Sequence, residues 1–131
     1  MKNPAPDQLV GLLRGTIAAL VRRDEPDLSA RQLAVMLTCY LEDEAQTVRG
    51  LAAELHVSKP AITRALDRLT EFELVRRKVD PLDRRSVLVQ RTSKGNAFMR
   101  DLSKTVHDLA ASFDKPASAA AMRRETVMEQ V

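Results

Sequence analysis

The chain has 131 residues, a length typical of one domain with a single core. Lys and Arg exceed Asp and Glu by three, and aromatic residues make up only 3% of the chain, so the core must be largely aliphatic. No apolar run approaches the roughly 20 residues that span a bilayer, and the first residues lack the apolar stretch of a signal peptide. Because Cys39 is the only cysteine, an internal disulfide is excluded. We therefore expect a cytoplasmic protein without a membrane partner.

The positive charge is concentrated in the middle of the chain. Residues 47–92 carry ten Lys and Arg against six Asp and Glu, whereas the other residues carry eleven against twelve. Basic segments occur in proteins that bind nucleic acids, but they are also common on ordinary solvated surfaces. Charge alone therefore leaves the function open.

Four helices are predicted in the first half of the chain, over residues 7–23, 29–42, 47–55 and 58–72. Ser29 and Gln32 form a capping box at the start of the second helix. The predicted buried residues of the first two helices are Leu9, Leu13, Ile17, Leu20, Val21, Leu33, Leu37, Tyr40 and Leu41. Those of the next two are Val48, Leu51, Ala52, Leu55, Ile62, Ala65, Leu66, Leu69 and Phe72.

The connection between the third and fourth helices is very short. Only His56 and Val57 separate Leu55 from Ser58, which is the predicted cap of the fourth helix, and Pro60 fits the first turn of that helix. Few folds need two helices so close together at a steep angle. The junction therefore indicates a helix-turn-helix.

A β-hairpin is predicted directly after the fourth helix. Residues 74–79 and 86–92 are rich in β-branched side chains, and the polar residues 80–85 between them form the predicted turn. A long helix over 93–113 follows, and residues 117–131 are expected to form a last short helix capped by Ser118. The expected fold is one mainly α domain over residues 1–131. It is a winged helix-turn-helix of five to six helices with a small hairpin wing, and residues 47–92 form its DNA-reading lobe.

The outward face of residues 58–72 carries residue types that recognise DNA. Arg64 could donate two hydrogen bonds to guanine, and Thr63 and Ala61 could touch a thymine methyl group in the major groove. Ser58 and Lys59 lie at the helix N-terminus, which suits a phosphate. An ordinary amphipathic helix with a solvated polar face is the simpler alternative.

Two further residues complete the expected DNA-binding set in the helices. Thr47, at the start of the third helix, is expected on the same face. Arg68 either reaches the DNA backbone or pairs with Asp67 or Glu71 nearby. The full set of expected DNA-contacting residues is Thr47, Ser58, Lys59, Ala61, Thr63, Arg64, Arg68, Arg84 and Arg85.

Four stretches of the chain resemble the MarR family of bacterial winged helix-turn-helix regulators. They read LAAELHVSKPAITRALDRL (51–69), LVRR (74–77), DPLDRRSV (80–87) and TSKG (92–95). The Asp-x-Arg-Ser motif from Asp83 to Ser86 is the most specific of them. The resemblance implies a homodimer, with residues 7–23 and 93–131 as the dimerisation helices. It implies a transcription regulator, expected to be a repressor, that binds an inverted repeat in double-stranded DNA.

The same resemblance assigns roles to the wing, residues 80–86. Arg85 is expected to enter the minor groove while Asp83 holds it in place, and Arg84 supports Arg85 or contacts phosphate. Asp83 and Arg85 could instead form an ion pair that only stiffens the turn. The resemblance also implies a pocket for a small aromatic effector that releases the DNA.

The chain departs from the family pattern at three places. His56 stands where many members have Gly, at a position that often needs φ > 0. Glu73 replaces another frequent Gly. The segments outside residues 25–113 are short, which predicts a smaller dimer interface and a reduced effector pocket.

Other functions have weaker support in the sequence. A winged-helix module that binds proteins rather than DNA is the alternative, because fold does not fix function. No catalytic motif or phosphate loop is present, so an enzyme is not expected, and no cofactor is predicted. His56 and His107 lie far apart with no cysteine cluster, so no metal site is expected. Cys39 could be a redox sensor, but its apolar neighbours favour a buried structural thiol.

Overall fold

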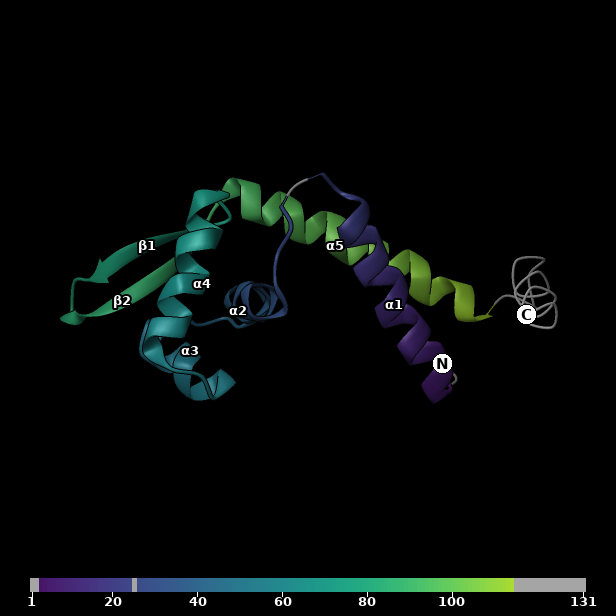
Figure 1. The fold of residues 1–131 in the computed structure, drawn as a ribbon, viewed down its shortest axis with the longest axis horizontal. Coiled ribbons are helices and arrows are strands. Elements are labelled where there is room, and N and C mark those ends of the chain that lie inside the picture. The colour runs from purple at the N-terminus through teal and green to yellow at the C-terminus, as the bar shows by residue number, and fades with distance from the viewer. Residues whose placement is uncertain (1–2, 25, 115–131) are drawn as a thin grey trace.

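The structure is a computed structural model that describes residues 3–24 and 26–114, and in these ranges it contains five α-helices and one β-hairpin (Figure 1). The elements are α1 (Pro6–Arg22), α2 (Ala30–Leu41), α3 (Val48–Leu55), α4 (Lys59–Glu71), β1 (Val75–Asp80), β2 (Asp83–Arg91), α5 (Ser93–Ala111) and the 3-10 turn η1 (Ser112–Asp114). The predicted mainly α winged helix-turn-helix is confirmed. The helix predicted over 117–131 with Ser118 as its cap lies outside the described residues.

The molecule has a lobe at one end and a two-helix arm at the other (Figure 1). The lobe contains α2, α3, α4 and the hairpin, which projects away from the helices. The arm is formed by α1 packed against α5. The long helix α5 begins at the base of the hairpin and runs out of the lobe, so it connects the two parts.

Side-chain caps fix where the helices of the lobe begin. Ser29 and Gln32 form the predicted capping box of α2. Thr47, Ser58 and Thr92 each accept a hydrogen bond from the backbone N–H three residues further on. Each cap satisfies a backbone donor that the first turn of a helix leaves without a partner, so the start of each helix is set by local sequence.

The core lies in the lobe, where Met36, Leu51, Ile62, Leu66 and Leu69 are fully buried. The predicted buried stripe of α4 is therefore largely correct. The stripe predicted for α2 is wrong except at Tyr40. Its buried residues are Val35, Met36, Cys39 and Tyr40, whereas Leu33 and Leu37 are half-buried and Leu41 is 70% exposed. Helix α2 packs against α4 and β2, and its Leu33 lies on the side toward α1, so its apolar residues lie on more than one face.

The hairpin is longer than predicted and its turn is shorter. Residues 80–85 were the predicted turn, but β2 already begins at Asp83, and only Pro81 and Leu82 connect the strands. The Asp80 carboxylate accepts a hydrogen bond from the Leu82 N–H at 2.9 Å, which stabilises this tight turn.

The base of the hairpin is fixed to the helices by polar contacts. The Tyr40 hydroxyl donates to the Leu74 carbonyl at 2.5 Å and accepts from the Thr92 N–H at 3.1 Å. Arg91 donates to the carbonyls of Cys39 and Glu42 at the end of α2, at 3.1 and 2.7 Å. These contacts join residues 34 to 52 positions apart and hold the wing in one place relative to α2.

Candidate nucleic-acid interface

Helix α4 presents most of its predicted DNA-contacting residues to solvent. Lys59, Thr63 and Arg64 are exposed, and Ser58 is the helix cap. Ala61 is a correction, because its side chain is only 6% exposed and cannot meet a thymine methyl group. Ala61 stands in the first turn, where the helix packs closely in the lobe, and its backbone N–H donates to the Ser58 hydroxyl at 3.2 Å.

Arg68 is held by its own helix. Its guanidinium pairs with the Glu71 carboxylate at 2.9 Å and lies 4.6 Å from the centre of the Phe72 ring. Of the two roles predicted for Arg68, pairing with Glu71 is the one that the structure contains. Asp67 instead pairs with Arg77 of β1 at 2.7 Å, and this ion pair ties the recognition helix to the wing.

The wing contains an irregularity at its arginines. Val79 pairs with Val87 and Asp80 with Asp83, so residues 84–86 have no partner in β1. Such bulges re-aim the side chains that they carry. One Asp83 oxygen accepts the Arg85 backbone N–H and the other accepts the Ser86 hydroxyl, both at 3.1 Å.

Asp83 therefore shapes the bulge through the backbone. The alternative ion pair between the Asp83 carboxylate and the Arg85 guanidinium does not occur among the ion pairs of the described residues. The guanidinium groups of Arg84 and Arg85 are exposed. The carboxylate that the sequence singled out thus fixes the position of Arg85 and leaves its charge available.

A crevice joins the wing to the helix-turn-helix. It has a volume of about 270 Å³ and lies between the N-termini of α3 and α4 and the strand β2. Its lining residues are Thr47, Val48, Arg49, Lys59, Thr63, Arg85, Ser86 and Val87. The structure thereby brings together four of the predicted site residues, whereas Arg64 and Arg84 do not line the crevice.

Arg49 is the residue of this crevice that sequence reasoning missed. It follows the cap residue Thr47 by two positions, but the sequence interpretation looked for basic residues only on the fourth helix and the wing. Within the described residues, no carboxylate lies within ion-pair distance of Arg49, Lys59 or Arg85. Three basic residues therefore line one hollow without an ion-pair partner among the described residues.

Two non-glycine residues near the interface have a left-handed backbone. His56 ends α3 with φ 55° and ψ 44°. This is the positive φ expected at a position where many family members have glycine. Glu73 has φ 61° directly before the wing. Both residues stand where the chain turns sharply, and this conformation costs a side chain with a Cβ of the order of 1 kcal/mol.

Cys39 is buried beside the base of the wing, as expected for a structural thiol. Its side chain is 6% exposed, and burial raises the pKa of the thiol from 9.0 to about 11, although the nearby Arg91 charge lowers it somewhat. At neutral pH the group therefore stays protonated and poorly nucleophilic. Within the described residues, no three His, Cys, Asp or Glu side chains lie close enough to hold a metal ion.

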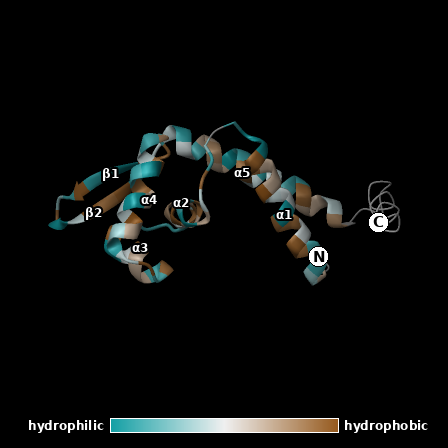
Figure 2. Ribbon diagram, in the orientation of Figure 1, coloured by the Kyte–Doolittle hydropathy of each residue, from teal (hydrophilic) through white to brown (hydrophobic). Residues whose placement is uncertain are grey.

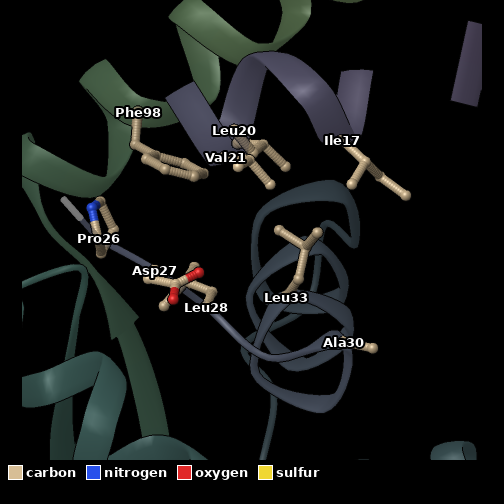
Figure 3. Close-up of a pocket in the computed structure, with 9 residues that line it drawn as sticks. All are labelled: Ile17, Leu20, Val21, Pro26, Asp27, Leu28, Ala30, Leu33 and Phe98. Atoms are coloured by element: carbon tan, nitrogen blue, oxygen red, sulfur yellow. The ribbon is translucent and has the colours of Figure 1, made fainter. Parts of the chain in front are cut away.

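A second cavity lies where the arm meets α2 (Figure 3). Ile17, Leu20 and Val21 of α1 face Leu33 of α2 across it, and Phe98 of α5 closes one side. The volume is about 190 Å³, and among the described residues of the lining Asp27 is the only charged one. None of the helices in the described ranges is long and apolar enough to cross a membrane.

Comparison with known proteins gives a consistent result. The model of the MarR family matches residues 28–87. A transcriptional regulator from Thermotoga maritima has a TM-score of 0.70 at 17% identity, over 95% of this chain and 86% of that one. A mutant of S. aureus MepR bound to an oligodeoxyribonucleotide has a TM-score of 0.72 at 15% identity, over 93% and 87% of the two chains. CouR from Rhodococcus jostii RHA1, bound to p-coumaroyl-CoA, has a TM-score of 0.61 at 25% identity, over 95% and 85%.

Proposed function

We propose that this MarR-family winged helix-turn-helix protein is a transcription regulator that binds double-stranded DNA with its recognition helix and its wing. The observation that carries the proposal is the crevice, which basic residues of α3, α4 and β2 line and which no carboxylate of the described residues lines. A surface of this kind attracts the phosphate backbone. The DNA-bound MepR structure shares the fold and supports the same function.

In the proposed complex, α4 enters the major groove with its N-terminal half. Thr63 and Arg64 face the base edges, and a bidentate contact from Arg64 to guanine contributes about 1–3 kcal/mol of discrimination. Ser58, Lys59 and Thr47 contact phosphates and set the register of the helix. Arg68 contributes little to DNA binding, because Glu71 already neutralises its charge.

The wing supplies the second contact. Arg85 enters the minor groove and Arg84 contacts the adjacent phosphates, while Asp83 holds the bulge that aims them. The Asp67–Arg77 ion pair keeps the wing in register with α4, so both elements dock together.

The active species is proposed to be a homodimer that acts as a repressor at an inverted repeat. The arm supports the dimer, because α1 exposes an apolar stripe that includes Val10 and Val21, which are 65% and 71% exposed. Figure 2 shows hydrophobic residues recurring along this helix. Exposed apolar surface of this kind is typical of an interface. A two-fold dimer reads two half-sites about one helical turn apart.

The cavity of Figure 3 is the proposed effector site. Its apolar lining suits a small aromatic compound, and its volume of about 190 Å³ lies below the roughly 300–1,000 Å³ of most ligand pockets. Asp27 disfavours an acidic ligand, so a neutral aromatic compound is proposed. A ligand there would wedge the arm from α2 and change the spacing of the two lobes, provided that it binds the two spacings differently. The CouR complex supports a ligand in this fold.

The test is selection of DNA sites by the purified chain from random duplexes, followed by affinity measurements at several salt concentrations. We expect an enriched inverted repeat, an affinity that falls as salt rises, and a large loss in the double variant Arg64→Ala, Arg85→Ala. Equal affinity for all duplexes, or affinity that salt does not change, would refute the proposal. If no duplex is retained and a protein partner co-purifies, the module binds proteins instead.

The effector proposal has its own test. Neutral small aromatic compounds should raise the melting temperature and weaken the binding of the selected duplex, and the matching carboxylic acids should do so less. If no compound of either kind stabilises the protein, the effector proposal is wrong while the DNA-binding proposal stands.

A further inference from the structure

We propose that the crevice between α3, α4 and β2 is the seat of one particular DNA phosphate, and that Arg49 is the side chain that fixes it. This inference rests on the DNA-binding function proposed above and states what the crevice holds. It assigns to Arg49 of α3 a phosphate contact that the proposed function does not include.

The charges around the crevice favour a single anion. Arg49, Lys59 and Arg85 come from three different elements, and no Asp or Glu of the described residues lines the crevice. Three like charges around one hollow repel each other, and an anion between them removes this repulsion. The volume of about 270 Å³ leaves room for a phosphate with some of its water.

Neutral donors complete the site. The Thr47 hydroxyl accepts the Gly50 N–H at 2.9 Å, so its own proton stays free to donate. The N–H group of Arg49 belongs to the first turn of α3, where a helix offers no carbonyl partner. The Thr47 hydroxyl and the Arg49 N–H are donors on two residues of the lining, and such directional donors complement the charges.

Arg49 differs from Lys59 and Arg85 because it does not belong to an element that reads bases. Lys59 stands at the start of the recognition helix, and Arg85 belongs to the proposed minor-groove contact. Arg49 lies on α3, outside both base-reading elements, and its planar guanidinium matches two oxygens of a phosphate. A phosphate held by Arg49 would therefore set the distance between the recognition helix and the wing on the DNA, without reading sequence.

The first experiment compares Arg49→Gln with Arg100→Gln on the duplex selected by the unchanged chain. Arg100 is an exposed arginine of α5 outside the crevice, so it controls for loss of one positive charge. Loss of one phosphate contact should lower the slope of log affinity against log salt by about 0.9 per lobe and weaken binding about fivefold per lobe near 0.15 M salt. Arg100→Gln should change neither by this amount, and Arg49→Lys should keep most of the slope.

The second experiment locates the phosphate. Each phosphate of the selected half-site is replaced in turn by an uncharged methylphosphonate, and affinity is measured for the unchanged chain and for Arg49→Gln. One position should weaken binding by the unchanged chain clearly more than binding by Arg49→Gln, because the two changes remove one contact in common.

The outcomes separate this inference from the broader function. If Arg49→Gln and Arg100→Gln have equal slopes, or if every methylphosphonate acts equally on both proteins, the phosphate seat is wrong although DNA binding stands. If the unchanged chain selects no duplex at all, the DNA-binding function itself fails.

Discussion

Replacement of Gly95 by alanine is expected to destabilise the lobe strongly. Gly95 lies in the first turn of α5, against the Tyr40 side chain and the Leu74 carbonyl. A Cβ built there would overlap the Tyr40 hydroxyl and the Leu74 oxygen and lie 2.5 Å from Tyr40 Cζ. The Leu74 oxygen is a backbone atom, and the Tyr40 ring is held by hydrogen bonds, so moving either of them away from the new Cβ costs stability.

The size of the effect follows from what the Tyr40 ring would lose. Moving the ring removes the hydrogen bonds to the Leu74 carbonyl and the Thr92 N–H, and a buried group left without a partner costs about 1–3 kcal/mol. Overpacking adds about 1–3 kcal/mol, and the better helix propensity of alanine returns at most about 1 kcal/mol. The expected net loss is about 1–5 kcal/mol of a total stability of roughly 5–15 kcal/mol.

The assay is urea unfolding followed by circular dichroism, at one fixed protein concentration because oligomers depend on it. Tyr40→Phe removes the hydroxyl that the new methyl group would strike, so the double variant should be more stable than the sum of the single losses by about 0.5–3 kcal/mol. Gly11→Ala is the control, since a Cβ there meets no atom within 4 Å. A Gly95→Ala protein within about 0.5 kcal/mol of the unchanged chain, or strict additivity with Tyr40→Phe, would refute this account of the packing.

Three further predictions concern the thiol, the strained turns and the wing. A thiol reagent should label Cys39 about a hundredfold more slowly in the folded than in the unfolded protein near pH 8, because the thiol pKa rises from 9.0 to about 11; equal rates would contradict the burial. Because the pKa of Cys39 is higher in the folded than in the unfolded protein, the stability that the protonated thiol contributes is fully present below pH 9 and is lost as the pH rises toward 11. The urea midpoint should therefore fall between pH 9 and 11. His56→Gly and Glu73→Gly should each raise the free energy of unfolding by up to about 1 kcal/mol in the same assay, since glycine adopts φ > 0 without strain; a loss in both would show that their side chains make contacts worth more than the strain. Asp83→Ala should weaken binding of the selected duplex without changing helical content, because the Arg85 N–H loses its acceptor, and unchanged affinity would mean that the bulge does not aim Arg85.

Features that depend on neighbours in the chain could be predicted from the sequence. The capping box of Ser29 and Gln32, the cap at Ser58 and the positive φ of His56 each involve residues within one helical turn. Helix periodicity likewise predicted the buried stripe of α4, because that helix packs on one face only. The fold class follows from the order of these local elements, and it was predicted correctly.

Features that depend on packing between distant elements were missed. Val35 and Met36 are fully buried, and the apolar residues of α2 lie on more than one face because the helix packs against α4 and β2 and also lies beside α1. The single apolar stripe predicted for α2 was therefore largely wrong. Ala61 was predicted to be exposed, yet it lies four residues before Ala65 and eight before Leu69, so it shares the buried face of α4. The turn of the wing was placed too wide because the bulge at residues 84–86 leaves no signal in hydrophobic alternation.

The sequence by itself determined that helices would begin at Thr47 and Ser58, that a tight junction would separate α3 from α4, and that a wing with Asp83 and Arg85 would follow. Hydrogen bonds across three residues and apolar periodicity carry that information locally. Only the tertiary structure decided that Arg49 would join Lys59 and Arg85 around one crevice. Their convergence depends on how α3, α4 and β2 pack together, and packing over such separations is set by the whole core rather than by any local run of residues.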